Sequence, residues 1–160
     1  MTLDAAQEYT VEIAASQADC FAAVVDFERY PTWASAVVQT RVLTRGPSDV
    51  ARTVEFHVDA KLKTIRYVLE YTGKKPSRLS WRSIDGDVEL IEGTYRFRKL
   101  APTRTEATCR QEIRLGFWLP GPLRTLAART ALQQSVSEFK LEVERRVGAE
   151  KPRGRRARDA

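Results

Sequence analysis

The stretch VVDFERYPTWASAV, residues 24–37, decides the fold, because a helix that enters it cannot leave it unbroken. Pro31 cannot continue an α-helix, but its fixed backbone angle suits the first turn of a new one. The stretch therefore predicts two short helices set at an angle to each other. Three aromatic side chains, Phe27, Tyr30 and Trp33, surround the break.

The residues before this break predict a strand followed by the first of the two helices. Apolar and polar side chains alternate over 9–13, which is typical of a half-buried strand. Ser16 offers an N-cap for the helix that follows, and Asp19, three residues later, resembles the second member of a capping box.

The residues after the break predict a run of further strands separated by turns. The separating segments RGPSD, GKKPS, IDGD and APTRT are rich in the residues that turns prefer. The six predicted strands are 37–43, 51–59, 62–71, 78–83, 88–100 and 105–117.

The chain closes with a long helical pattern over 121–147. Its apolar positions recur at spacings of three and four, and Pro122 suits its first turn. The face predicted to be buried consists of Ala128, Leu132, Val136, Phe139 and Val143. One strand, two short helices, six strands and one long helix predict an α+β fold, with helices gathered on one face of an antiparallel sheet.

Composition places the chain among ordinary globular proteins. Its 160 residues, 42% hydrophobic and 30% charged, suffice for one domain with a substantial core. The first residues lack the pattern of a signal peptide, and no apolar run is long enough to span a membrane. Cys20 and Cys109 lie far apart in apolar patterns and are expected to be buried free thiols rather than a disulfide, so we expect a cytoplasmic protein.

The net charge of +6 is concentrated at the end of the chain. Residues 151–160 carry five basic side chains and one acidic one, while charges of both signs are interspersed over the body. We therefore expect a domain over 1–147, a disordered basic tail over 148–160, and no specific binding of nucleic acid. A solvated tail without a partner is the main expectation, and weak contact with an anionic membrane is the alternative.

Four segments of the chain carry a resemblance to a known family. They are residues 11–37, with the motif Asp-Phe-x-x-Tyr-Pro-x-Trp, EGTYRFRKL at 92–100, TEATCRQEIRLGF at 105–117, and the closing segment 118–147. Together they resemble the START-like superfamily (SRPBCC, the helix-grip fold), and more narrowly its bacterial polyketide cyclase/dehydrase and coenzyme Q-binding types. The resemblance spans roughly residues 8 to 147.

The resemblance implies a curved, seven-stranded antiparallel sheet wrapped around the long C-terminal helix, with a cavity between them closed at one end by the two short helices. It implies that the cavity binds or carries a hydrophobic small molecule, such as a lipid, polyketide, isoprenoid or quinone. One alternative is a polyketide cyclase, aromatase or dehydratase acting in the same cavity. Another is an interaction module whose cavity is filled by its own side chains. The oligomeric state is left open.

Strand parity predicts which side chains would line that cavity, because alternate residues of a strand face the same side. Apolar and aromatic residues with a few polar groups form the predicted wall, which is a common composition for ligand pockets. For Phe27 and Tyr30, plain core packing is an equal alternative. The predicted lining residues are Trp33, Phe56, Ile65, Tyr67, Leu69, Trp81, Tyr95, Phe97, Gln111 and Thr130, with Gln134 as an alternative to Thr130.

Catalytic motifs are sparse in the sequence. The single histidine, His57, is predicted to face outward with Glu55, which argues against a histidine metal site or a Ser-His-Asp triad. No phosphate-cradling glycine motif occurs, so we expect neither cofactor nor metal. Cyclases of the resembled family are thought to use an inward arginine, for which this chain offers no counterpart. If the protein is an enzyme, Tyr67 is the candidate acid, assisted by Gln111.

Overall fold

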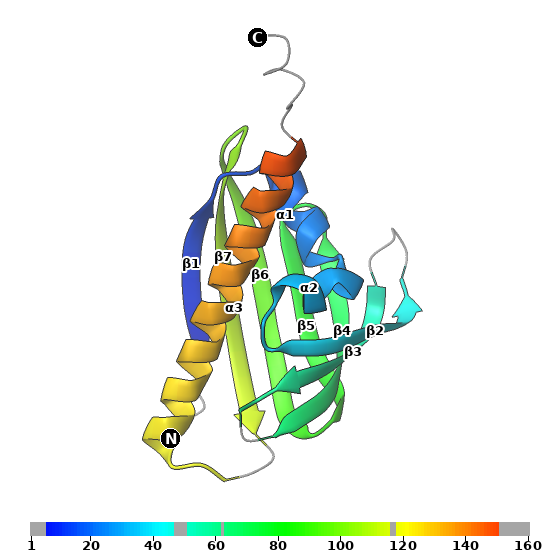
Figure 1. Ribbon diagram of the computed structural model, residues 1–160, viewed down its shortest axis with the longest axis vertical. Helices are drawn as coiled ribbons and strands as arrows, with labels where there is room; N and C mark the ends of the chain where they lie inside the picture. The colour runs from blue at the N-terminus through cyan, green and yellow to red at the C-terminus, as the bar shows by residue number, and fades with distance from the viewer. Residues whose placement is uncertain (1–5, 47–50, 62, 116–117, 151–160) are drawn as a thin grey trace.

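The computed structural model describes residues 6–46, 51–61, 63–115 and 118–150 (Figure 1). The elements, in chain order, are β1 (Gln7–Ile13), α1 (Gln17–Val24), the 3₁₀ turn η1 (Phe27–Arg29), α2 (Tyr30–Trp33), β2 (Val37–Arg45), β3 (Ala51–Asp59), β4 (Thr64–Lys74), β5 (Arg78–Gly86), β6 (Val88–Ala101), β7 (Arg104–Leu115) and α3 (Gly121–Glu150).

All seven strands form one antiparallel sheet in the order β1-β7-β6-β5-β4-β3-β2. The sheet curves, and the helices lie on one of its faces, with α3 running along the β1 and β7 side (Figure 1). This is the helix-grip fold, and the predicted class, strand number and element order are confirmed.

The helix break forms as the sequence predicts. The backbone N–H of Asp19 donates to Ser16 Oγ at 3.1 Å, which caps the first turn of α1. Pro31 lies in the first turn of α2, where its missing N–H costs nothing. The hydroxyl of Tyr30 donates to the carbonyl of Val24 at 2.5 Å and so holds the second helix against the end of the first.

Several element boundaries differ from the predicted ones. Strand β5 continues to Gly86 through an irregularity in its pairing with β4 beside Val68 and Leu69, a feature that the sequence does not signal. Strand β2, which forms one edge of the sheet, pairs with β3 through three register shifts. Residue 62 and residues 116–117, predicted to lie in strands, fall outside the described residues.

Helix α3 continues through Glu150, three residues beyond the predicted end of the domain. The first residues of the predicted tail, 148–150, therefore belong to the helix. The remainder of the predicted disordered tail, 151–160, falls outside the described residues.

The second half of α3 is anchored by apolar and ionic contacts. Leu132, Val136, Phe139 and Val143 are buried against the sheet, as the helical spacing predicts. The buried Glu142 accepts hydrogen bonds from Arg145 and Arg146, and Arg146 reaches Asp26 at 3.1 Å. These contacts fix α3 against the break between α1 and η1. Within the described part of the chain, no helix has the length and apolar character needed to cross a membrane.

Candidate functional site

The concave face of the sheet carries a continuous cluster of aromatic rings. Neighbouring ring centroids lie between 4.4 and 6.5 Å apart, within the range of favourable ring pairs. Six of the rings belong to predicted lining residues, five of them placed by strand parity and the sixth, Trp33, by α2. The cluster consists of Phe27, Tyr30, Trp33, Phe56, Tyr67, Tyr71, Trp81, Tyr95, Phe97 and Phe139.

Two of these rings have mainly structural surroundings. Phe27 is almost fully buried between Tyr30 and Tyr71, and the Tyr30 hydroxyl is engaged with the Val24 carbonyl. Of the two alternatives for Phe27 and Tyr30, cavity lining and core packing, the structure therefore favours core packing.

The remaining predicted lining residues behave differently from one another. Ile65 and Leu69 are buried on β4. Thr130 is exposed on α3, and its prediction is wrong: it precedes the buried Leu132 by two residues, which places it on the opposite side of the helix at 100° per residue. The alternative, Gln134, is also exposed and donates to the hydroxyl of Ser35 at 2.7 Å.

Gln111 is bonded to a tryptophan rather than placed beside Tyr67. Its side-chain oxygen accepts a hydrogen bond from Trp81 Nε1 at 3.0 Å. The indole reaches Gln111 because Gly93 lies between them: a Cβ on Gly93 would stand 2.6 Å from a carbon of the indole ring. This hydrogen bond could not be predicted from the sequence, because it depends on the register of β5, β6 and β7.

Tyr67 lies where the aromatic cluster becomes partly exposed. Its ring stacks on Phe56 with centroids 5.6 Å apart, and its side chain is partly buried. Burial raises the pKa of the Tyr67 phenol, so the group is protonated at neutral pH and acts as a hydrogen-bond donor rather than a base.

Two buried polar atoms in the cluster have no hydrogen-bond partner among the described residues. They are Trp33 Nε1 and Tyr95 Oη. Both rings pack against Phe139, at centroid distances of 5.9 and 5.2 Å. Buried donors are almost always paired in folded proteins, with protein groups or with ordered water, so an acceptor atom at either donor would be favourable.

The concave face offers donors but no convergent charges. Within the described residues Glu142 is the one buried charged side chain, and its hydrogen bonds from Arg145 and Arg146 hold its pKa below the usual range. Burial raises the pKa of the Cys20 thiol to about 11 and that of Cys109 to about 12, so neither is a reactive thiolate. No group of metal-binding side chains occurs in the described ranges.

One end of the concave face is less covered than the other. At the end where β7 finishes and α3 begins (Figure 1), several inward apolar residues are only partly buried, although Ile65 and Ile91 are buried, and we call this the open end. The opposite end, where α1 and the last turns of α3 pack together, we call the packed end. The partly buried inward residues of the open end are Val37, Val58, Tyr67, Val88 and Ile113.

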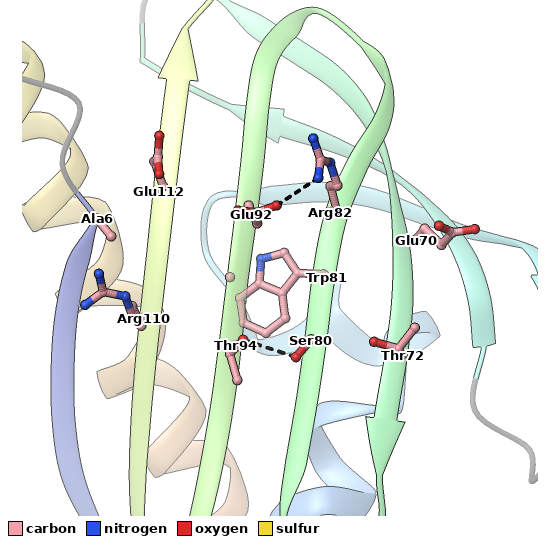
Figure 2. A pocket seen from close by; sticks show the side chains of 11 residues that line it. Ala6, Glu70, Thr72, Ser80, Trp81, Arg82, Glu92, Thr94, Arg110 and Glu112 are labelled. Carbon is pink, nitrogen blue, oxygen red and sulfur yellow. Dashed lines mark hydrogen bonds and ion pairs between the residues drawn. The ribbon is translucent and has the colours of Figure 1, made fainter. Parts of the chain in front are cut away.

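A hollow lies on the other, convex face of the sheet and was not predicted. It has a volume of about 490 Å³ and a polar wall that includes Thr72, Ser80 and Thr94 (Figure 2). These three short side chains lie in register on neighbouring strands, an arrangement that the sequence of any one strand does not reveal. Arg82 and Glu92, also in its wall, form an ion pair at 3.3 Å.

His57 and Glu55 face outward on the convex side of the sheet, as strand parity predicts. His57 Nε2 lies 3.3 Å from Glu55 Oε1, and Glu55 accepts a hydrogen bond from Arg66 at 2.7 Å. These groups form an ion-pair network on the side of the sheet away from the aromatic cluster.

Solved structures share this fold at low sequence identity. A START superfamily protein from Mycobacterium smegmatis is 20% identical, with a TM-score of 0.81 over 88% of this chain and 97% of that one. The Zhui aromatase/cyclase from Streptomyces sp. R1128 is 18% identical, with a TM-score of 0.74 over 89% and 94%. The di-domain aromatase/cyclase StfQ of the steffimycin pathway is 19% identical, with a TM-score of 0.68 over 89% of this chain and 46% of that one.

Among curated protein sequences, none matches the chain significantly. The sequence family described as "Polyketide cyclase / dehydrase and lipid transport" matches it over residues 5–147. That match covers almost all of the described residues, and the helix-grip fold agrees with it. The chain therefore belongs to the polyketide cyclase/dehydrase and lipid transport family, and it shares its fold with a solved START superfamily protein.

Proposed function

We propose that the protein binds and carries a hydrophobic small molecule with a hydrogen-bond-accepting oxygen, held between the concave face of the sheet and α3. A polyketide, a quinone, or an oxygen-bearing isoprenoid or lipid has this chemistry. The observation that supports the proposal is the pair of unpartnered buried donors, Trp33 Nε1 and Tyr95 Oη, inside an aromatic cluster. A carbonyl oxygen could accept a hydrogen bond from either donor while the rings contact the apolar remainder of the molecule.

Transport without chemistry is favoured over catalysis by the groups that face inward. They are aromatic rings, hydroxyls and one amide, and the amide oxygen of Gln111 is already bonded to Trp81. A cyclase or dehydratase remains the second candidate, with Tyr67 as the hydrogen-bond donor to a substrate carbonyl. The raised pKa of Tyr67 favours this role over that of a base. Solved cyclases of the same fold lend it support only by analogy.

The proposal also covers the bounds of the binding domain and its location in the cell. We place the domain in residues 1–150, which include the whole of α3, without cofactor, metal or specific nucleic-acid partner. A cytoplasmic location is supported by the free, buried thiols of Cys20 and Cys109.

The test compares two ligands with the same fused rings, naphthoquinone and naphthalene, by quenching of tryptophan fluorescence. Tyr95→Phe removes one donor and should weaken naphthoquinone binding by about 0.5–1.5 kcal/mol, the usual net value of a hydrogen bond. Naphthalene, which has no acceptor oxygen, should bind both forms equally. His57→Ala, on the other face of the sheet, is the matched control and should change neither titration.

Two results would count against the proposal. Equal weakening of both ligands by Tyr95→Phe would mean that the hydroxyl maintains packing and contacts no ligand oxygen. Failure of either ligand to bind the wild type, together with an empty protein in native mass spectrometry, would favour the interaction module whose interior is filled by its own rings.

A further inference from the structure

The start of α3 exposes an apolar surface that packs on no described part of the protein. Trp118 is 79% exposed, and Leu123 and Leu126 are 55% and 56% exposed. Leu123 lies half a helical turn around α3 from the buried Leu132, so it points away from the sheet. We call this surface the apolar end of α3, and it consists of Trp118, Pro122, Leu123, Leu126 and Ala127, all of them exposed.

The segment that carries this surface is basic. Between Glu112 and Glu138 the sequence contains no acidic residue, and it contains Arg114, Arg124 and Arg129. Arg114 pairs with Glu112 at 2.9 Å, and Arg124 is partly buried beside the carbonyl of Leu119. Arg129 is exposed one turn from the apolar residues. A surface with exposed apolar and basic side chains is complementary to a partner that has an apolar interior beneath a negatively charged surface.

Another exposed leucine on the same helix lies in different surroundings. Leu141 is 65% exposed, but its neighbours in sequence include Glu138, Glu142 and Glu144. Exposure of a single leucine is ordinary for a soluble protein, whereas a contiguous apolar surface is not. Leu141 therefore provides an internal control for the apolar end of α3.

We propose that the apolar end of α3 docks the protein on the surface of an anionic lipid bilayer. Trp118 and the two leucines would enter the boundary between headgroups and acyl chains, where tryptophan side chains are favoured. The arginines would contact lipid phosphates, since basic residues near an anionic surface add to binding.

A second copy of the chain is a poorer occupant of this surface. A two-fold contact would bring together two copies of a segment that carries Arg124 and Arg129, with no acidic residue in 113–137 to neutralise them. The location also favours lipid, because the surface adjoins the open end, where Val88 and Ile113 are only partly covered (Figure 1).

The experiment is flotation of the full-length protein with vesicles of phosphatidylcholine alone or mixed with phosphatidylglycerol, without added ligand. The wild type should float with the anionic vesicles and not with the neutral ones. The double variant Leu123→Ser, Leu126→Ser should lose at least tenfold in binding, and Arg129→Gln should lose several-fold. Leu141→Ser should bind like the wild type. Circular dichroism checks that all four proteins are folded.

Fluorescence adds a readout that reports the position of the contact. Trp81 is buried and Trp33 is partly buried, so a blue shift on adding anionic vesicles should come from Trp118 and should disappear in Trp118→Phe. Because all variants retain residues 151–160, attachment through the basic tail would leave every variant bound alike and would overturn the proposal. Concentration-dependent dimerisation of the wild type, abolished in the double variant without any vesicle binding, would overturn it too. Vesicle binding needs no ligand, so its outcome is separate from that of the proposed function.

Discussion

The two halves of α3 share one secondary structure and have opposite surroundings. At the packed end, Phe139 and Val143 are almost completely buried between the sheet and α1. At the open end, Leu123 and Leu126 are more than half exposed. Their positions around the helix already differ, because Phe139 and Val143 share the face of Leu132 whereas Leu123 lies half a helical turn from it. The sheet beneath distinguishes them, since its aromatic rings reach α3 only at the packed end, through Phe139.

The largest expected difference between the halves is in stability. Phe139→Ala removes a ring that contacts Trp33, Tyr95 and Phe97, and it should lower the free energy of unfolding by about 3–5 kcal/mol. Leu126→Ala should lower it by less than about 0.5 kcal/mol, as surface changes do. Urea denaturation of the two variants measures both values. Similar losses would mean that the two halves of α3 are equally packed.

The ionic anchor of the packed end should depend on pH. Hydrogen bonds from Arg145 and Arg146 hold the pKa of Glu142 below its usual range. The carboxylate therefore stabilises the fold fully above its unfolded-state pKa of about 4.3, and this contribution is lost as the pH falls through the lower folded-state value. Glu142→Gln should lower the free energy of unfolding by about 1–3 kcal/mol at neutral pH.

The same variant should differ less from the wild type in acid. Unfolding of both proteins by urea at neutral pH and at a series of lower pH values measures this, because the wild-type carboxylate becomes protonated as the pH falls through its lowered folded-state pKa. Glu92→Gln, which removes an exposed partner of Arg82, is the control and should have little effect at any of these pH values. A gap between Glu142→Gln and wild type that is constant with pH would show that the carboxylate charge contributes nothing.

Between the two ends, Gly93 permits the indole of Trp81 to lie across β6. A methyl group there would stand 2.6 Å from the ring, so Gly93→Ala should displace the indole and break its hydrogen bond to Gln111. The expected cost in stability is about 1–3 kcal/mol, with a change in tryptophan emission. Gly148→Ala, with no atom within 4 Å and a helical backbone, should be neutral or slightly stabilising. Equal stability of the two variants would contradict the position of the Trp81 ring.

The smallest expected effect belongs to the open end. Tyr67→Phe removes a hydroxyl that no described residue bonds, so stability should change by less than about 0.5 kcal/mol. Naphthoquinone binding should weaken by about 0.5 kcal/mol, because water competes for a partly covered site. Fluorescence titration measures this, with naphthalene as the reference ligand. If Tyr67→Phe weakens naphthoquinone binding more than Tyr95→Phe does, the ligand oxygen lies at the open end, beside Tyr67.

Much of the fold was predictable because its signals are local. The break at Pro31, the cap at Ser16 and the apolar spacing of α3 each act within one or two turns of helix, and all are confirmed. Alternation along strands also identified the inward side chains, since period two leaves only one apolar face. For Thr130 the signal was present and was misread, because the spacing from Leu132 already placed it on the outer side of α3.

The contacts that cross between strands and helices were not predictable from one sequence. Glu142 reads as a surface charge of a helix, and only the position of α1 beside α3 buries it. The Trp81–Gln111 hydrogen bond requires the register of β5, β6 and β7, which turn lengths do not fix. The unpaired donors Trp33 Nε1 and Tyr95 Oη emerge only when every neighbouring side chain has been placed.

The irregular pairing of β2 has a consequence for colloidal behaviour. As the outermost strand on its side of the sheet, β2 exposes Val38 and Leu43, and a straight strand of this kind would invite another chain to extend the sheet. Its three register shifts interrupt the ladder that an incoming strand would need, and Arg41 and Arg45 add charge to the rim. Uncontrolled growth of the sheet into fibrils is therefore opposed along this edge.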